Sequence, residues 1–378
     1  MKVYVNAVSI REGGPRVVLV KLLTALLHQY PALKIRVAAS PNLSAEMKDL
    51  PASMQPVVVG QSPLTLAKWY EWNLARSANE WSADVIFSVT NYLPLRRLDI
   101  PTLLLEQHAG HFSPVFDRLM HAPAVPVLER LVWDMKTRWV RRSVESATVL
   151  TVQTAVLADA IAAVTRVARD AIRVIPHGPG WAELRSASPP ALRDPRRPFR
   201  IGYIAKPGVQ KNFTTLLHAV KKMSERGKDI RLVLTLDPAI SWTTPILAEA
   251  ESLGVARLIE NRGETGPVEL TDVYDGLDVF VFPSLCESFG MPMAEAMARG
   301  LCVVVADTPE NREIVGPAGL FFPATQAEDL AALLERLYDD EQEVAKHASM
   351  SLRRAGAFSW QSAAELTFEA LGTAADAR

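Results

Sequence analysis

The sequence has little cysteine, no long apolar run and almost no net charge. Its two cysteines, Cys286 and Cys302, fit a reducing compartment better than a disulfide scaffold. No uncharged apolar run reaches the roughly 18 residues needed to span a bilayer, and the N-terminus has the pattern of a strand rather than of a signal peptide. The 41 basic and 42 acidic residues nearly cancel, which argues against nucleic acid as a partner. We expect a cytoplasmic protein, with the inner face of the plasma membrane as a second, peripheral location.

Two motifs of nucleotide-using enzymes are also missing. No Gly-x-Gly-x-x-Gly run follows the first predicted strand, with an acidic residue about twenty positions later, so a nicotinamide-dependent dehydrogenase is disfavoured. No Asp-x-Asp pair stands at a predicted strand end, where metal-dependent transferases bridge Mg²⁺ or Mn²⁺ to a diphosphate. We therefore expect no metal and no cofactor.

Strand patterns alternate with helical patterns along all 378 residues, which is typical of βαβ units and parallel sheets. The stretch 186–198, SASPPALRDPRRP, has no apolar period and is predicted to be a linker. We expect an α/β protein with two Rossmann-like domains and a cleft between them: 1–185, then 199–357, with a C-terminal segment 358–378 packing back towards the first domain. The predicted strands are 3–8, 35–40, 56–60, 84–89, 102–107, 148–153, 200–206, 230–236, 278–283, 302–307 and 319–323.

The most informative stretch is VFVFPSLCESFGMPMAEAMARGLCVVV, residues 279–305. It predicts a buried strand, a loop with Glu287, a helix that opens at Pro292 and carries Glu295 about one turn in, and a second buried strand after Gly300. Ligands of open α/β sheets bind at the carboxyl ends of the strands. This loop is therefore the predicted site.

These residues resemble the retaining glycosyltransferases of family four, also known as glycosyl transferases group 1, which have the GT-B fold. The resemblance is densest over 261–337, and it extends to GYIAKPGVQKN (202–212), VIPHG (174–178), the Gly13–Gly14 loop and the terminal FSW (358–360). It implies two facing Rossmann-like domains and a nucleotide-sugar substrate.

The resemblance implies that Glu287 contacts the transferred sugar and that Glu295 holds the ribose. Ionised carboxylates suit both tasks because they accept two hydrogen bonds from vicinal hydroxyls. The loop residues before the helix complete the predicted donor site, because their amides and the positive helix end favour a diphosphate; they are Ser288, Phe289, Gly290 and Met291. The alternative for Glu295 is a carboxylate that only complements the helix dipole.

Lys206 and Lys211 follow the predicted strand 200–206 and can neutralise charge on a departing nucleotide diphosphate. The family usually has Arg at the first position, so Lys206 keeps the charge but lacks the bidentate fork. The alternative is a pair of solvated surface lysines.

The first predicted domain offers weaker signals. Gly13 and Gly14 let the backbone approach a phosphate or sugar, although a plain tight turn fits them equally. His108 matches the family's histidine that contacts the transferred sugar, and His111 competes for that assignment. His177 stands where relatives commonly carry Asn, and we interpret it as structural.

Residues 126–142 predict a helix with Val127, Leu131, Met135 and Trp139 on one stripe and basic residues on its other faces. Such a helix could lie on an anionic membrane. The other interpretation, which the pattern favours, is a core-packing helix with a basic exposed side.

The sequence thus predicts a metal-independent hexosyltransferase that retains the anomeric configuration. Its donor is GDP- or UDP-linked, its acceptor is a hydroxyl of a glycan or lipid-linked molecule, and the resemblance favours mannose and bacterial surface-polysaccharide or lipopolysaccharide assembly. Two alternatives stay open: a sugar-nucleotide epimerase or hydrolase with the same fold, and a binding protein without turnover.

Overall fold

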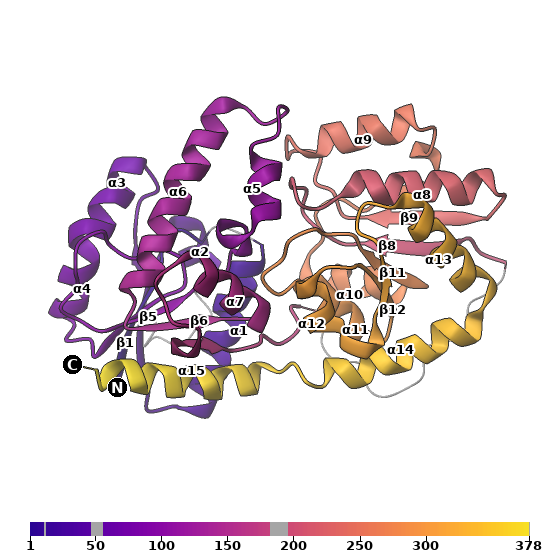
Figure 1. Cartoon of the computed structure of the whole chain (residues 1–378). Helices are drawn as coiled ribbons and strands as arrows, with labels where there is room; N and C mark the ends of the chain where they lie inside the picture. The colour runs from indigo at the N-terminus through magenta and orange to yellow at the C-terminus, as the bar shows by residue number, and fades with distance from the viewer. Residues whose placement is uncertain (11–12, 47–55, 182–195, 378) are drawn as a thin grey trace. The chain divides into compact units, whose positions relative to one another are not determined.

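The computed structural model describes residues 1–10, 13–46, 56–181 and 196–377, and these form two α/β units (Figure 1). Unit 1 comprises Met1–Gly178 and Ser359–Arg378, whereas unit 2 comprises Pro179–Phe358. Most of the predicted linker, 186–198, lies outside the described residues. Each unit is built on its own parallel sheet.

Unit 1 contains a sheet of seven parallel strands in the order β3-β2-β1-β4-β5-β6-β7. In register, Val5 of β1 lies between Val37 of β2 and Phe87 of β4. The strands are β1 Lys2–Ala7, β2 Lys34–Ala39, β3 Val57–Val58, β4 Val85–Ser88, β5 Thr102–Leu105, β6 Val149–Val152 and β7 Ile172–Val174.

Helices connect these strands, and the last helix of the chain belongs to the same unit. Tyr30, at the end of α1, stacks on Phe368 of α15 with ring centroids 3.8 Å apart. The helical segments are α1 Gly14–Gln29, α2 Pro41–Glu46, α3 Pro63–Lys68, the π-helical η3 Trp69–Asn73, α4 Leu74–Glu80, η4 Ala109–Phe112, α5 Pro114–Met120, α6 Val127–Ser146, α7 Ala155–Val164, η5 Arg169–Ala171 and α15 Trp360–Ala375.

Unit 2 has six parallel strands in the order β10-β9-β8-β11-β12-β13. The strands are β8 Phe199–Tyr203, β9 Ile230–Leu234, β10 Ile259–Asn261, β11 Val279–Phe282, β12 Cys302–Ala306 and β13 Leu320–Phe322. The helical segments are α8 Phe213–Glu225, α9 Thr243–Ser252, η6 Ala256–Leu258, α10 Pro267–Asp275, α11 Met291–Ala298, α12 Pro309–Val315, η7 Gly316–Ala318, α13 Ala327–Asp339 and α14 Glu341–Ala355.

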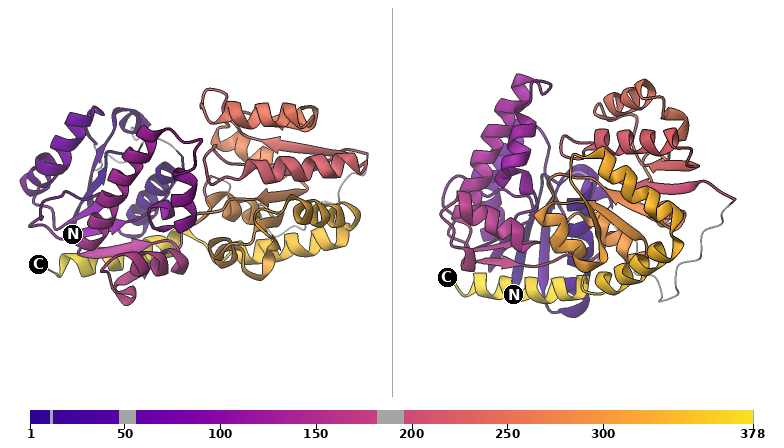
Figure 2. Two further views of the ribbon diagram at one scale, coloured as in Figure 1. Left: turned by 45° about the horizontal axis from the view of Figure 1, so that its top comes forward. Right: turned by 45° about the vertical axis from the view of Figure 1, so that its right-hand side comes forward.

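The central strands of unit 2 are apolar without alternation because both faces of the sheet are covered by helices (Figure 2). All four residues of β11 and all five of β12 are buried. The core of this unit extends from these strands into α8, α11 and α13, which contribute Leu216, Met297 and Leu334. The predicted α/β class with two parallel sheets is confirmed.

Strand order reverses direction once in each sheet, between β1 and β4 in unit 1 and between β8 and β11 in unit 2. Loops leaving the carboxyl ends of such neighbours diverge and leave room for a ligand. The loops after β8 and β11 carry the predicted lysines and Glu287. The fold therefore places the principal predicted residues at the switch point of unit 2.

The elements differ from the sequence prediction in a few places. The short strands β7 and β10 were not predicted, because their sequences, IRV and IEN, mix charged and polar residues with apolar ones. Between β3 and β4, the π-helical turn η3 separates α3 from α4, and the sequence gives no sign of this irregular turn. Helix α6 begins at Val127 as expected, but Val127, Leu131 and Met135 are more than half exposed. The core-packing interpretation is wrong for these three residues, while Trp139 does pack, against Tyr70 and Tyr92.

Candidate functional site

Glu287 and Lys211 form an ion pair at the switch point of unit 2. Lys211 Nζ lies 2.5 Å from Glu287 Oε1, and the side chains are only 15% and 14% exposed. Ser284 Oγ donates to the same carboxylate oxygen at 2.6 Å. The structure thus brings together two residues that lie 76 positions apart in the sequence, and it holds the Glu287 carboxylate in one orientation.

Backbone contacts fasten the two loops that carry this pair. Leu285 N donates to Gln210 O at 2.9 Å, which joins the loop after β11 to the loop after β8. Asn212 has a left-handed backbone (φ 51°), and its Nδ2 donates to Pro283 O and Ala324 O. Asn311 Nδ2 donates to Ser284 O. A network of this kind lets the site keep its geometry without a ligand.

Lys206 lies in a different environment from Lys211. Its side chain is 41% exposed, and its Nζ is 3.7 Å from Glu264 Oε1. Lys211, by contrast, also lies 5.6 Å from the centroid of the Phe282 ring. Lys211 is therefore the predicted lysine that forms an ion pair with Glu287, and the side chain of Lys206 is the more exposed of the two.

Glu295 lies one turn into α11 and is 5% exposed. Its Oε1 accepts from Trp181 N at 2.8 Å, and its Oε2 accepts from Tyr274 Oη at 2.7 Å. Burial and the charge of Glu295 hold the pKa of Tyr274 well above its usual value. Because both oxygens accept bonds from other segments, Glu295 does more than complement the helix dipole.

The chain passes close to Glu295 at Gly180. A Cβ atom at this position would stand 2.1 Å from Glu295 Oε1 and 2.8 Å from Met291 Sδ, so no other residue fits without rearrangement. The backbone at Gly180 therefore packs closely against the first turns of α11. Sequence analysis missed this approach, since one glycine in a loop gives no specific signal.

The start of α11 has the predicted form. Gly290 is its N-cap with φ 69°, Met291 is its first residue and Pro292 stands in the first turn, where no amide donor is needed. Phe289 is buried and meets Phe358 edge to face at 5.4 Å. Ser288 and Met291 are half-buried. The amide end of this helix and the Glu287 loop belong to one continuous turn of chain, which suits an anionic group beside a hydroxyl-bearing one.

Glu310 is a third acidic residue at this edge, and sequence analysis missed it. It lies in the first turn of α12, whose cap is Thr308. Burial raises the pKa of the Glu310 carboxyl, and the charge of Glu287 raises it further. The signal was available, because Glu310 follows β12 much as Glu287 follows β11. A carboxyl that protonates more readily can donate as well as accept a hydrogen bond.

In unit 1, Gly13 and Gly14 stand at the start of α1. Gly13 is the N-cap with φ 72°, a conformation that favours glycine, and a Cβ atom on either residue would meet nothing within 4 Å. The backbone conformation therefore favours glycine at position 13 only, and the space beside both glycines is open.

His108 and His111 follow β5 within an aromatic cluster. His111 is 4% exposed, stacks on Trp133 at 4.3 Å and shares a hydrogen bond with Thr137 Oγ1. Burial, aided by the charge of His108, lowers the pKa of His111 to about 2, so it is neutral. His108 is only half-buried. It is therefore the better placed of the two competing histidines to meet a ligand.

Glu106 supports the turn that carries His108. It is fully buried, and its Oε1 accepts from His108 N at 2.8 Å. Burial raises the pKa of Glu106 well above the usual value, more than the backbone hydrogen bonds lower it. Sequence analysis did not single out this residue, because its burial is a tertiary property.

A cavity of about 240 Å³ opens at the switch point of unit 1. Its polar lining comes from three loops: Ser9 after β1, Thr90 and Asn91 after β4, and Gln107 after β5. Gln107 N donates to Asn91 Oδ1 at 2.8 Å, and Asn91 has a positive φ of 66°. These neutral hydrogen-bonding groups suit hydroxyls, and they match no short motif that the sequence would reveal.

His177 is buried and stacks on Trp360 of α15. Burial lowers its pKa to about 3. Within the described residues, one group of side chains has metal-ligand spacing, namely Asp117, His121 and Asp134, and it lies on and between α5 and α6. Among the helices of the described ranges, none is both long and apolar enough to cross a bilayer.

The match to a known family lies within unit 2. Residues 186–353 match the family model described as glycosyl transferases group 1. MMP α-(1→4)-mannosyltransferase of Mycolicibacterium hassiacum is 35% identical over 182 residues, covering 46% of this chain and 43% of its own length. O-antigen chain mannosyltransferase B of Escherichia coli is 30% identical over 171 residues, covering 44% of each. The chain thus spans less than half of these relatives.

Solved structures match the whole chain. Sucrose-phosphate synthase of Thermosynechococcus elongatus has a TM-score of 0.78 at 17% identity, covering 97% of both chains. HepE of Anabaena, in complex with UDP and glucose, has a TM-score of 0.72 at 15% identity, covering 98% of this chain and 99% of its own. These likenesses establish the fold. The chain has the GT-B fold, and residues 186–353 confirm its predicted resemblance to the glycosyl transferases group 1 family.

Proposed function

We propose that this protein is a retaining glycosyltransferase that moves a hexose from a nucleotide-diphosphate sugar to a hydroxyl of a glycan or lipid-linked acceptor. The family match over 186–353 and relatives named as mannosyltransferases support the class. The observation that carries the proposal is the half-buried Lys211–Glu287 pair beside the start of α11.

Lys211 and the start of α11 supply what a departing diphosphate needs. The Lys211 ammonium has three donors, and its contact with Glu287 uses one, so it can also donate to a phosphate oxygen. The amide end of α11 adds partial positive charge. Charge that develops as the sugar–phosphate bond lengthens is thereby stabilised by groups already in place. Lys206 acts as a weaker, solvated cation at the same edge.

The two glutamates act as hydroxyl clamps. Glu287 accepts from hydroxyls of the transferred sugar while Lys211 and Ser284 hold it ionised and oriented. Glu295 contacts the ribose. Each of its oxygens accepts one bond from Trp181 N or Tyr274 Oη, and a carboxylate oxygen has a second lone pair for a ribose hydroxyl.

Unit 1 receives the acceptor. Its 240 Å³ cavity presents Ser9, Asn91 and Gln107, which are neutral partners for hydroxyls. His108 and the open Gly13–Gly14 turn lie at the same carboxyl edge of the sheet. The same-face route, in which the leaving phosphate helps to deprotonate the acceptor, follows from the family resemblance and gives retention.

Mannose is the sugar that the relatives favour, since two of them are named as mannosyltransferases and one of these acts on O-antigen chains. We infer a place in the assembly of surface polysaccharide or lipopolysaccharide. The charge of the leaving group is met by Lys211 and α11, so EDTA should leave the rate unchanged.

The test is transfer itself. Purified protein is incubated with GDP-mannose or UDP-glucose and a panel of glycan and polyprenyl-linked acceptors, and the anomeric configuration of the product is read by NMR. We expect a retained configuration, with turnover lost in Glu287→Gln. Donor breakdown without need of an acceptor would indicate an epimerase or hydrolase instead, and donor binding without any turnover would indicate a binding protein.

A further inference from the structure

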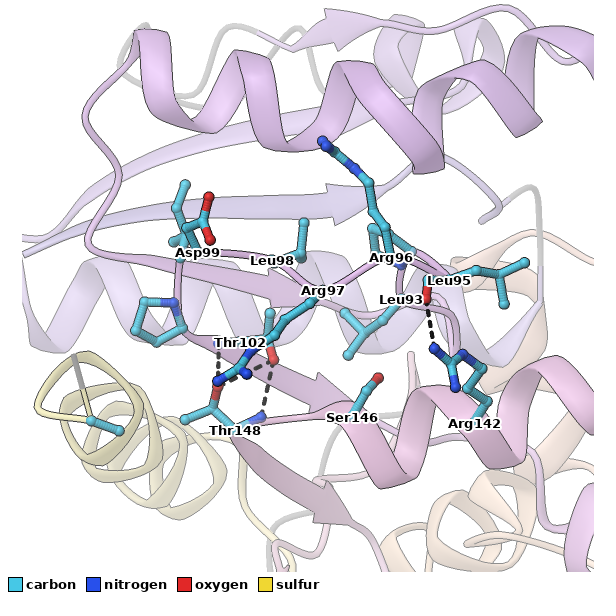
Figure 3. Close-up of a pocket in the computed structure, with 14 residues that line it drawn as sticks. Leu93, Leu95, Arg96, Arg97, Leu98, Asp99, Thr102, Arg142, Ser146 and Thr148 are labelled. Carbon is cyan, nitrogen blue, oxygen red and sulfur yellow. Dashed lines mark hydrogen bonds between the residues drawn. The ribbon is translucent and has the colours of Figure 1, made fainter.

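The loop between β4 and β5 separates two cavities of unit 1. A cavity of about 820 Å³ lies on one side, lined by the loop residues 93–101 and by the start of β5 and β6, with Thr102 and Thr148 (Figure 3). A cavity of about 460 Å³ lies against helix residues of η3 and α4. Both are reached at the amino ends of the strands, the edge opposite to that of His108. They therefore take no part in the site already described.

Arg96 and Arg97 line both cavities, and both are exposed. Figure 3 shows that Arg97 extends over Thr102 and Thr148, whereas Arg96 extends from the loop in the opposite direction. Neither side chain has a hydrogen bond or ion pair with any residue of the described ranges. Each guanidinium therefore presents an unneutralised positive charge to solvent, and an anion beside it would be stabilised.

The loop is held in place by groups other than these arginines. Arg142 Nη2 donates to Leu95 O at 2.8 Å, and Glu71 Oε1 accepts from Leu95 N at 2.9 Å. Trp139 Nε1 donates to Leu93 O at 2.7 Å. The backbone of the loop is therefore held from both sides, and the side chains of Arg96 and Arg97 are exposed and take no part in holding it.

The surroundings are suited to phosphate. Arg142 and the hydroxyls of Ser146 and Thr148 line the larger cavity. Lys68 lines the smaller one, as does Arg76, which is paired with Glu80. Asp99 is the acidic residue in these linings. Arginine forks match phosphate oxygens two at a time, and hydroxyls complete such sites. A volume of about 820 Å³ admits a molecule of nucleotide size.

An apolar element lies beside the charges. Trp72, placed by the π-helical turn η3, is 61% exposed and lines the smaller cavity, and Leu95 is 48% exposed on the loop. π-Helical turns are uncommon and are frequently found at functional positions. Apolar side chains next to cations are what a phosphate attached to an apolar body requires.

We propose that the loop 93–101, through Arg96 and Arg97, forms a second anion site of this protein that binds a phosphate-bearing ligand. The phosphate belongs either to a lipid headgroup of an anionic membrane or to a soluble phosphate ester. The site does not depend on glycosyl transfer.

The test uses the full chain and two matched double variants. Arg96→Gln with Arg97→Gln removes the proposed ligands, whereas Lys346→Gln with Arg353→Gln removes two exposed cations of α14 and serves as the control. Binding to vesicles of phosphatidylglycerol and phosphatidylcholine in equal parts is measured by co-sedimentation. Binding of inorganic pyrophosphate is measured by calorimetry, and circular dichroism checks the fold.

We expect R96Q/R97Q to weaken binding to at least one probe by roughly tenfold or more, and K346Q/R353Q to change it less than twofold. Because pyrophosphate also meets Lys211, only the difference between wild type and R96Q/R97Q reports this site. A loss seen with vesicles alone identifies a lipid headgroup, and a loss seen with pyrophosphate identifies a soluble phosphate. The proposal is overturned if wild type binds neither probe, if R96Q/R97Q binds both as wild type does, or if the control loses as much.

Discussion

The carboxyl edges of the two sheets carry different chemistry. In unit 2 this edge has charged and acidic groups, namely the Lys211–Glu287 pair, the buried Glu295 and the half-buried Glu310, whose pKa is raised. In unit 1 it has aromatic rings, two histidines, hydroxyls and amides, and the buried acid Glu106 has a pKa well above normal. The same strand order therefore supports an ionic edge in one unit and a largely neutral edge in the other.

Under the proposed function, the edge of unit 2 binds the donor and the edge of unit 1 binds the acceptor, and donors vary less in their chemistry than acceptors do. A nucleotide-diphosphate sugar always presents a diphosphate, a ribose and a hexose, so fixed charges and carboxylates at set positions serve any donor. An acceptor hydroxyl has no fixed charge and varies between enzymes. The family model covers 186–353, which lies entirely within unit 2, and it matches no residue of unit 1.

The largest effect is expected at Lys211. Lys211→Ala removes the proposed leaving-group cation and leaves Glu287 without its ion pair, so transfer should fall by roughly 100-fold or more, the scale of removing one preorganised charge donor. Lys206→Ala, at a 41% exposed side chain, should cost less than tenfold. Steady-state rates with saturating donor measure both. Equal losses would contradict the distinction between a half-buried lysine, Lys211, and an exposed one, Lys206.

The next effect is expected at Tyr274. Tyr274→Phe leaves Glu295 Oε2 without its hydroxyl donor in a buried position, which should lower the free energy of unfolding by about 1–3 kcal/mol. Urea denaturation followed by circular dichroism measures this. Tyr338→Phe, at a tyrosine elsewhere in unit 2, is the control. An unchanged midpoint for Tyr274→Phe would show that Glu295 does not need this partner.

A smaller effect concerns acid stability of unit 1. His177 has a pKa of about 3 in the fold against 6.5 when unfolded, so the unfolded chain gains a proton first as pH falls, and stability declines below about pH 6.5. Between pH 7 and pH 5, wild type should lose about 1–2 kcal/mol more than His177→Phe. Denaturant unfolding of unit 1 at each pH can be followed by tryptophan fluorescence, since six of the eight tryptophans lie in unit 1. Parallel pH profiles for the two proteins would refute this.

The smallest effect is expected for Glu106→Gln. Because the pKa of Glu106 is raised, the fold favours the neutral carboxyl, and stability that Glu106 contributes is lost as pH rises above its unfolded value near 4.5. A neutral amide should therefore change stability by less than about 0.5 kcal/mol at low pH and make the variant relatively more stable towards pH 7. Thermal unfolding at both pH values is the measurement, and a variant that is less stable at pH 7 would contradict it.

Much of unit 2 could be predicted from its sequence. The strand–loop–helix–strand unit around Glu287 and Glu295 is local, so apolar runs, a proline and two glycines place both glutamates correctly relative to the sheet. Predicting that Lys211 pairs with Glu287 would also have required knowing that the strands before them, β8 and β11, are neighbours in the sheet. Glu310 was missed although the same argument applies to it.

Tertiary facts could not be predicted. The approach of Gly180 and Trp181 to Glu295 joins residues more than a hundred positions apart. The exposure of Val127, Leu131 and Met135 depends on what packs against α6, and a helical stripe looks the same in the sequence whether it is covered or not. The depressed pKa of His111 likewise arises from burial against Trp133.

The proposed assignment of the donor to the ionic edge of unit 2 and of the acceptor to the neutral edge of unit 1 is tested most directly by calorimetric titration with GDP and UDP. Wild type, Lys211→Ala and His108→Ala are compared under the same conditions. The account predicts that one nucleoside diphosphate binds wild type and His108→Ala with similar affinity and binds Lys211→Ala at least about tenfold more weakly. Unchanged binding to Lys211→Ala, together with lost binding to His108→Ala, would place the donor on unit 1 and contradict the account.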